Sequence, residues 1–259
     1  MLENLEKIKE DLEKILYESG EIVKAVYMQG SKISAEADRY NFLTTDYDIT
    51  VNDLLIRRLR DAYSHYSIIS EELPDIDVDS LYSFVVDPID GTRNFVRGIP
   101  VFFIGISLVE EKRSVLSMTY NPITSELFYA IKGKGAFLNG QPIKVGDRGF
   151  DVSDICIRTL PDKELQKQVV SNIIGNVHQV KNNMCSHDEI SGVACNRYDG
   201  FVSKHSSPWD YCQYLLVEEA GGMVTDWNGE EFDISKDNIV VSNGIIHSEL
   251  LKATKDSVM

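Results

Sequence analysis

The chain has 259 residues, 43% of them hydrophobic and 26% charged, so it is long enough to bury a large core. Its formal net charge of −15 predicts that neither nucleic acid nor an anionic membrane is a partner, because their phosphates would be repelled. An anionic substrate would need that repulsion to be cancelled locally, and metal cations are the simplest means. No segment approaches the ~20 apolar residues of a membrane span. The charged N-terminus and the four scattered cysteines predict a reduced, cytoplasmic protein.

The first 66 residues predict two helices. Apolar residues recur every three or four positions over 2–26, which is typical of an amphipathic helix, with Gly20 as a weak point. Residues 30–46 lose the pattern and are expected to form a mobile polar segment. A second helix is predicted over 51–66, which places Asp53 in its first turn.

Strands dominate the middle of the chain. Short buried strands are predicted at 68–69 and 84–86, and acidic residues follow each of them. Three longer strands and a hairpin with an Asn-Gly turn are then predicted between 101 and 145. The pattern favours an antiparallel sheet.

The remainder mixes helices with short strands. Helices are predicted near 163–174, 188–194 and 210–220 and from 248 onward, and a buried strand is predicted at IVVSN. These blocks indicate layered α and β elements. We expect two halves, 1–147 and 148–259, that form one compact unit.

Acidic residues stand at the edges of four apolar elements: Asp53, Glu71-Glu72, Asp87 with Asp90, and Asp210. Each has a simple alternative explanation, since acids after strands meet water and acids in a first helical turn favour the dipole. The stretch DPIDGT is harder to explain in that way. Pro88 interrupts strand pairing, so Asp87 and Asp90 can converge, and Gly91-Thr92 begins a helix whose amides suit a phosphate. Carboxylates for Mg²⁺ beside amides for phosphate predict metal-assisted phosphate chemistry.

DPIDGTRNF, together with SEEL at 70–73 and PWDYCQYLLVEEAGG at 208–222, resembles the inositol monophosphatase family. The hairpin GKGAFLNGQPIKV also resembles that family, so the likeness covers most of the chain. It implies an α/β (α+β) fold, a layered αβαβα sandwich of the sugar-phosphatase type with mixed and antiparallel sheets. It also implies a Mg²⁺-dependent, lithium-sensitive phosphomonoesterase and homodimerisation.

The resemblance implies a set of metal ligands. Glu71, Asp87, Asp90 and Asp210 would surround two or three Mg²⁺ ions, for which Mn²⁺ can substitute, and the Ile89 carbonyl would be a neutral ligand. Glu72 would lie nearby.

The resemblance also implies the catalytic and phosphate-binding residues. The amides of Gly91 and Thr92 match phosphate-holding positions, and Asp53 would pair with Thr92 to orient the attacking water. Glu71 would support that water as a catalytic residue, and Asp90 and Asp210 would also face the substrate.

One departure from the family concerns the substrate. Ser203 occupies the position at which inositol-selective members carry a sugar-binding glutamate, so inositol 1-phosphate is not the only expected substrate. Lys204 and His205 could instead meet a second anionic group, although a surface role is the simpler interpretation of both.

The expected partner is a small phosphorylated metabolite, either a polyol or a sugar. The alternatives are a 3′(2′),5′-bisphosphate nucleotidase, a fructose-1,6-bisphosphatase-like enzyme, or a regulatory binding protein that retains the fold. The complete ligand set favours an enzyme.

Overall fold

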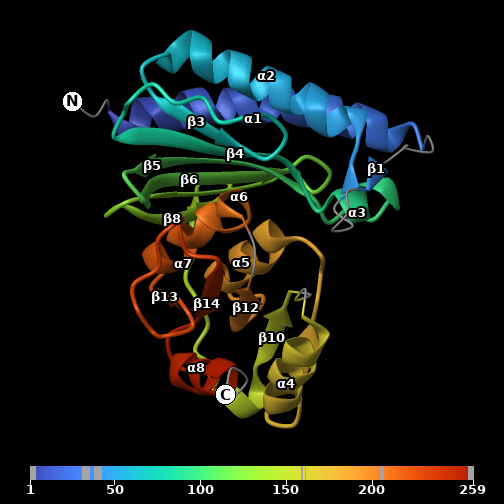
Figure 1. The fold of residues 1–259 in the computed structure, drawn as a ribbon, viewed down its shortest axis with the longest axis vertical. Coiled ribbons are helices and arrows are strands. Elements are labelled where there is room, and N and C mark those ends of the chain that lie inside the picture. Colours follow the sequence, from blue (N-terminus) through green and yellow to red (C-terminus); the bar gives the residue numbers. More distant parts are fainter. Residues whose placement is uncertain are drawn as a thin grey trace.

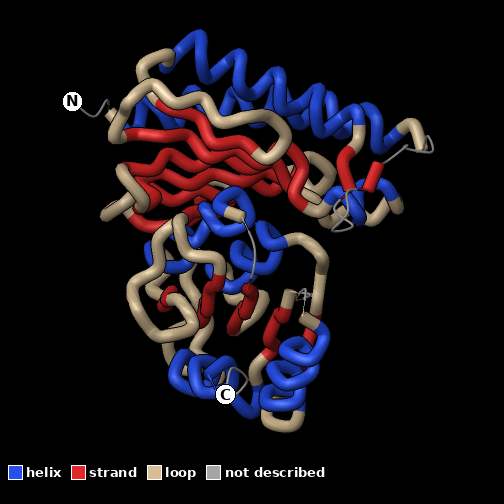
Figure 2. The backbone as a smooth tube through the Cα atoms, in the orientation of Figure 1, coloured by secondary structure: helices blue, strands red, loops and turns tan. Residues whose placement is uncertain are grey.

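The computed structural model describes residues 4–30, 36–37, 43–158, 160, 162–204 and 207–255. Most of the segment expected to be mobile, 30–46, lies outside these residues. The described elements form five stacked layers, in which a helical pair, a large sheet, a set of helices, a smaller sheet and an outer helical pair follow one another (Figure 1). The strands of the two larger sheets form separate groups with helices between them (Figure 2). The predicted αβαβα fold class is confirmed.

Two long helices cover the outer face of the large sheet. They are α1 (Leu5–Met28) and α2 (Asp46–Tyr63), and both pack into the same core as the sheet (Figure 1). The N-cap of α1 is Asn4, whose side chain accepts a hydrogen bond from the Glu6 amide at 3.0 Å. Apolar residues on one face of each helix therefore provide the first core.

The large sheet has seven strands in sequence order from β3 to β9. Only the β3–β4 pair is parallel, and the others form an antiparallel meander, as the strand and hairpin pattern predicted. The strands are β3 (Ser67–Ser70), β4 (Tyr82–Asp90), β5 (Phe103–Glu110), β6 (Arg113–Asn121), β7 (Glu126–Ile131), β8 (Gly135–Leu138) and β9 (Gln141–Pro142).

The smaller sheet has the strand order β11-β10-β12-β14-β13 and mixes parallel and antiparallel pairs. Its strands are β10 (Asp154–Ile157), β11 (Gln179–Lys181), β12 (Gly200–Lys204), β13 (Met223–Thr225) and β14 (Asn238–Ser242). Its outer face packs on α4 (Lys163–Ile174) and α8 (His247–Lys255). The division at residue 147 remains a prediction.

The middle layer contains α5 (Ser186–Ala194), α6 (Pro208–Tyr211) and α7 (Leu215–Glu219). These helices share a core with strands of both sheets. The helix expected over 210–220 is interrupted, because the 3-10 turn η2 (Cys212–Tyr214) separates α6 from α7. The remaining described elements are β1 (Glu36–Ala37) paired with β2 (Leu43–Thr44), α3 (Thr92–Val96) and the 3-10 turn η1 (Phe150–Val152).

The second helix starts five residues earlier than predicted. Thr45 is its N-cap, and a capping box joins Thr45 to Asp48, whose carboxylate accepts from the Thr45 amide at 2.8 Å. The first turn therefore carries Asp46 and Asp48. Asp53 lies about 1.4 turns beyond Asp48 along the helix. This shift decides which aspartate reaches the site.

The α1 helix runs unbroken through Gly20, contrary to the expected weak point. A Cβ atom at this position would lie 2.5 Å from the Cε1 atom of the buried Tyr120 ring. We expect Gly20→Ala to destabilise the protein by about 1–3 kcal/mol, because overpacking outweighs the better helix propensity of alanine. Urea unfolding would measure the change. Gly175→Ala is the control, since a Cβ there meets nothing within 4 Å, and an equal effect of both variants would contradict the explanation.

Candidate active site

An irregularity in β4 turns Asp87 and Asp90 toward the same side of the sheet. Residues three apart in a regular strand point to opposite faces. Asp87 pairs with Gly105 and Asp90 pairs with Phe103, so three steps along β4 oppose two steps along β5. The extra residue is a bulge that reverses the alternation. The convergence predicted for DPID is therefore confirmed.

Asp210 joins these two aspartates from the middle layer. Carboxylate oxygens of Asp87, Asp90 and Asp210 all lie within 4.8 Å of one another, and the three residues are buried. Asp210 is the third residue of α6, and one of its oxygens caps that helix by accepting from the Ser207 amide at 2.9 Å. The other oxygen, Oδ1, pairs with Arg158 and accepts from the Ser186 hydroxyl at 3.3 Å. Residues 120 positions apart in the sequence thus form one acidic group.

The cluster has the properties of a cation site. The Oδ1 atom of Asp87 is buried and has no hydrogen-bond partner in the described part of the chain. Burial, with the charges of Glu71, Asp90 and Asp210, holds the pKa of Asp87 well above its usual range. Burial and the charges of Asp210 and Glu72 likewise raise the pKa of Glu71. An all-oxygen set with a buried, unpartnered acceptor fits a hard divalent cation.

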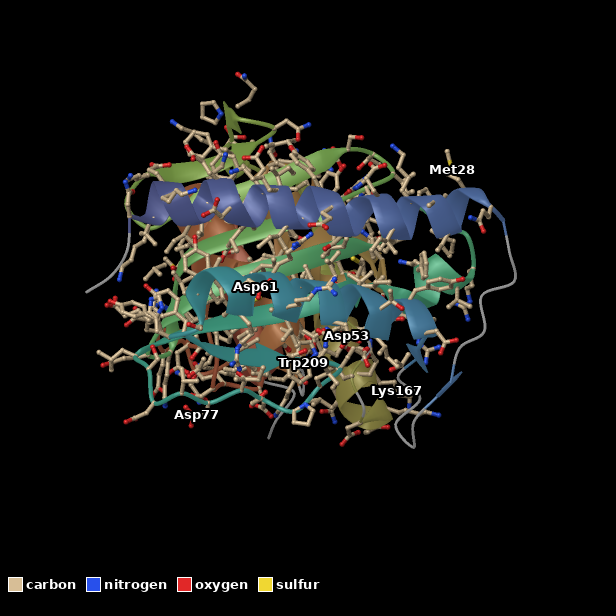
Figure 3. The ribbon with its side chains drawn as sticks, turned by 90° about the horizontal axis from the view of Figure 1, so that it is seen from above. Met28, Asp53, Asp61, Asp77, Lys167 and Trp209 are labelled. Atoms are coloured by element: carbon tan, nitrogen blue, oxygen red, sulfur yellow. The ribbon has the colours of Figure 1, made fainter. Side chains whose placement is uncertain are left out.

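Asp48, rather than Asp53, is the aspartate next to Thr92. The Thr92 hydroxyl lies 3.3 Å from Asp48 Oδ1 and 3.0 Å from the carbonyl oxygen of Ile89. Burial raises the pKa of Asp48 to about 6, against the opposing hydrogen bonds from Thr45 and Thr92. Asp53 is exposed on α2, as Figure 3 shows in a view from the helical side. The predicted Asp53–Thr92 pair is therefore wrong, because a five-residue step rotates a helical side chain by about 140°.

Gly91 joins β4 to α3 in a conformation that favours glycine. Its φ of +88° lies in the left-handed region, and an added Cβ would lie 2.8 Å from the Val101 carbonyl oxygen. The first amides of α3 follow directly, and first-turn amides have no intrahelical acceptor. Gly91 and Thr92 thus lie beside the acidic cluster, as the phosphate-binding prediction requires.

The start of α5 contacts Asp90 in a way that the sequence did not reveal. The backbone N–H of His187 donates to Asp90 Oδ2 at 2.6 Å, and the thiol of Cys185 donates to the same oxygen at 3.2 Å. The Ser186 hydroxyl lies 3.5 Å from the other oxygen of Asp90. The His187 ring is fully buried, with its Nε2 atom 3.6 Å from Asp87 Oδ2. These contacts fix the orientation of the Asp90 carboxylate.

Arg158 is the other group that sequence reasoning missed. It follows β10 directly, and its Nη1 atom pairs with Asp210 and donates to the Ser186 hydroxyl at 2.8 Å. The only available signal was a charged residue placed just after a buried strand. A permanent cation therefore faces the acidic cluster from the smaller sheet.

Of the residues considered for substrate selection, the structure describes Ser203 and Lys204. Ser203 is fully buried, and its hydroxyl accepts from the Tyr211 hydroxyl at 2.9 Å, which contradicts the prediction that it contacts a substrate. Lys204 lies over the Trp227 ring, with Nζ 5.0 Å from the ring centroid. His205 lies outside the described residues.

Comparison with known proteins places this site in a family. Residues 4–259 match the model of the inositol monophosphatase family. The chain belongs to the inositol monophosphatase family. It is therefore a phosphatase.

Individual relatives agree with this membership. The chain is 33% identical over 227 residues to inositol monophosphatase 3 of Solanum lycopersicum, which covers 83% of this chain and 84% of the relative. It is 30% identical over 217 residues to a fructose-1,6-bisphosphatase/inositol-1-monophosphatase of Thermotoga maritima. That alignment covers 83% of this chain and 84% of the relative. The structure of the extragenic suppressor protein suhB from Bartonella henselae superimposes with a TM-score of 0.91 at 28% identity, over 96% of this chain and 98% of that one.

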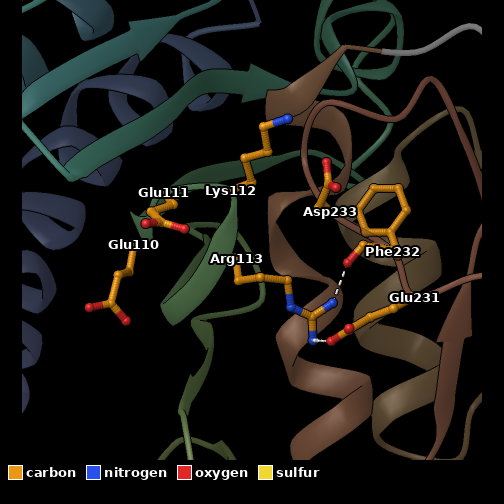
Figure 4. A pocket seen from close by; sticks show the side chains of 7 residues that line it. All are labelled: Glu110, Glu111, Lys112, Arg113, Glu231, Phe232 and Asp233. Atoms are coloured by element: carbon orange, nitrogen blue, oxygen red, sulfur yellow. Dashed lines mark hydrogen bonds and ion pairs between the residues drawn. The ribbon is translucent and has the colours of Figure 1, made fainter.

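A separate depression is not part of the family site. It has a volume of about 480 Å³ and lies where the β5–β6 turn meets residues 231–233 (Figure 4). Arg113 within it pairs with Glu218 and Glu231 and donates to the Phe232 carbonyl. The charge of Arg113 is thus balanced by neighbouring carboxylates. Within the described ranges, no helix is long and apolar enough to span a membrane.

The raised pKa of Glu72 predicts that wild type and Glu72→Gln differ in stability by an amount that depends on pH. Burial, followed by the charge of Asp48, raises the pKa of Glu72 to about 7. A carboxyl whose folded pKa is raised favours the folded state below its unfolded pKa and loses that contribution as pH rises through about 7. Metal-free Glu72→Gln should therefore melt at a higher temperature than the wild type at pH 8, with the difference vanishing toward pH 5.

Thermal melts in EDTA would measure that difference between the two proteins. Contributions from groups that Glu72 does not influence are the same in both proteins and cancel. A difference that stays constant between pH 5 and pH 8 would contradict the electrostatic explanation.

Proposed function

We propose that the protein is a Mg²⁺-dependent phosphomonoesterase that hydrolyses a small phosphorylated polyol or sugar. The single observation that carries the proposal is the convergence of three buried aspartates beside the Asp48–Thr92 pair and the first amides of α3. Family membership supports phosphate-ester hydrolysis. The unpartnered oxygen of Asp87 supports a divalent cation at the cluster.

Five groups of this chain would hold the cations. They are the carboxylates of Glu71, Asp87, Asp90 and Asp210 and the carbonyl oxygen of Ile89. We propose two or three Mg²⁺ ions, with Mn²⁺ as a substitute, because hard cations prefer oxygen ligands. Bound Mg²⁺ supplies charge stabilisation for the phosphoryl group and lowers the pKa of a coordinated water.

The other residues position the ester and move the proton. The amides at the start of α3 would donate hydrogen bonds to the phosphate oxygens, because they are directed away from the helix and carry partial positive charge. The Thr92 hydroxyl would orient the attacking water, and its hydrogen bond passes the proton toward Asp48. Asp48 is suited to this role because burial raises its pKa to about 6, so it is a stronger base than an exposed aspartate and stays ionised at neutral pH.

A panel of phosphate esters would test the proposal. Phosphate release would be assayed with Mg²⁺, with and without Li⁺, from inositol 1-phosphate, fructose 1,6-bisphosphate, adenosine 3′,5′-bisphosphate and NADP. We expect Mg²⁺-dependent, Li⁺-inhibited release from at least one polyol or sugar phosphate. A strong preference for the adenosine bisphosphate would identify a nucleotidase instead. Release from none of the esters would leave the regulatory alternative, in which the fold is retained without activity.

A further inference from the structure

Arg158 presents one edge of its guanidinium group to the site and leaves the other edge open. Its Nη1 atom is anchored by Asp210 and by Ser186 at 2.8 Å. In the described part of the chain, neither Nε nor Nη2 has a partner. The side chain is 23% exposed, so this free edge is accessible to solvent and to a small ligand.

The free edge has the geometry of an oxyanion receptor. The Nε–H and Nη2–H bonds of arginine are parallel and match the two oxygens of a carboxylate or a phosphate. Anchoring of Nη1 removes most of the side-chain freedom that binding would otherwise cost. A guanidinium group is a permanent cation, so Arg158 stays charged while it is held in place.

Arg158 and the amides proposed to hold the reacting phosphate come from different parts of the fold. The reacting phosphate is assigned to the amides of α3 in the large-sheet half, whereas Arg158 approaches the cluster from the end of β10 in the smaller sheet. Lys204, which the sequence suggested as a contact for a second anionic group, packs on Trp227 instead.

We propose that Arg158 is the specificity-determining residue of this site, and that it binds a second anionic group, carboxylate or phosphate, on the phosphate ester. The preferred substrate is therefore a doubly anionic ester rather than the monophosphate of a neutral polyol. This inference rests on the proposed function, because it places the reacting phosphate at the proposed metal and α3 site.

The binding test compares two non-hydrolysable ligands of equal length. Calorimetry in saturating Mg²⁺ would measure 4-phosphonobutyrate, which carries a carboxylate, and butylphosphonate, which lacks it. We expect the wild type to prefer 4-phosphonobutyrate by about ten- to a hundredfold, the effect of a bidentate charged hydrogen bond. Arg158→Met should lose that preference, and Arg158→Lys, which keeps the charge without the fork, should retain part of it.

Arg58→Met is the matched control. It removes the same charge from an exposed pair with Glu18 on the outer helices and should keep the wild-type preference. Equal affinity of the wild type for both ligands would overturn the proposal, as would an unchanged preference in Arg158→Met. Kinetics provide a parallel measurement. The kcat/KM for fructose 1,6-bisphosphate, divided by the kcat/KM for inositol 1-phosphate, should be lower in Arg158→Met than in the wild type. If no ester of the panel is hydrolysed but the wild type still prefers 4-phosphonobutyrate and Arg158→Met does not, the proposed function fails while the role of Arg158 in binding stands.

Discussion

Asp90→Asn is expected to lower Mg²⁺-dependent phosphate release by about a thousandfold or more. The substitution removes one of three converging carboxylates, and metal-derived charge stabilisation of a phosphoryl group is worth several kcal/mol. The fold should persist, because an asparagine oxygen can still accept from the His187 amide and the Cys185 thiol. Steady-state phosphate release at saturating Mg²⁺ would measure the loss, and thermal unfolding in EDTA would verify the fold.

Asp61→Asn provides the control for that experiment. Asp61 is exposed on α2, so the variant has the same charge change without touching the cluster. We expect its activity to stay within about twofold of the wild type, as is usual for surface substitutions. If Asp90→Asn kept more than a tenth of the wild-type activity with its fold intact, the cluster could not be the metal site of the reaction.

Asp48→Asn is expected to lower kcat by about 10²- to 10⁴-fold, the usual contribution of a positioned general base. An amide at this position cannot take a proton from Thr92, although it can still accept the capping hydrogen bond from Thr45. The same substitution at Asp53 should leave kcat within about twofold, because Asp53 is exposed on α2. Side-by-side rate measurements at pH 7.5 would separate the two aspartates. The opposite pattern would restore the pairing expected from the sequence.

The pH dependence of kcat/KM provides a second test of Asp48 as the general base. Burial raises the pKa of Asp48 to about 6, so the protonated fraction increases as pH falls through 6 and the base is lost. We therefore expect kcat/KM of the wild type to decline below about pH 6. The residual activity of Asp48→Asn should lack that decline. A decline of the same midpoint in both proteins would assign it to another group.

Much of the fold could be predicted because the local patterns are strong. The periodicity of α1, the Asn-Gly turn between β8 and β9 and the helix over 163–174 all appeared where expected. The start of α2 did not, because the prediction followed apolar spacing and ignored the capping box between Thr45 and Asp48. That local signal was present in the sequence. The resemblance to the family had assigned the pairing with Thr92 to Asp53, whereas the structure gives it to Asp48.

The sequence by itself determined the chemistry of this protein: DPIDGT places two carboxylates beside a helix start, and the downstream Trp-Asp pair supplies a third. Only the tertiary structure decided which groups face them. The α5 amides that hold Asp90, the anchored guanidinium of Arg158 and the burial of Ser203 depend on how the smaller sheet packs against the larger one. Such contacts join residues up to about a hundred positions apart, and no local propensity encodes them, because their free energy comes from burial and charge pairing in the assembled core.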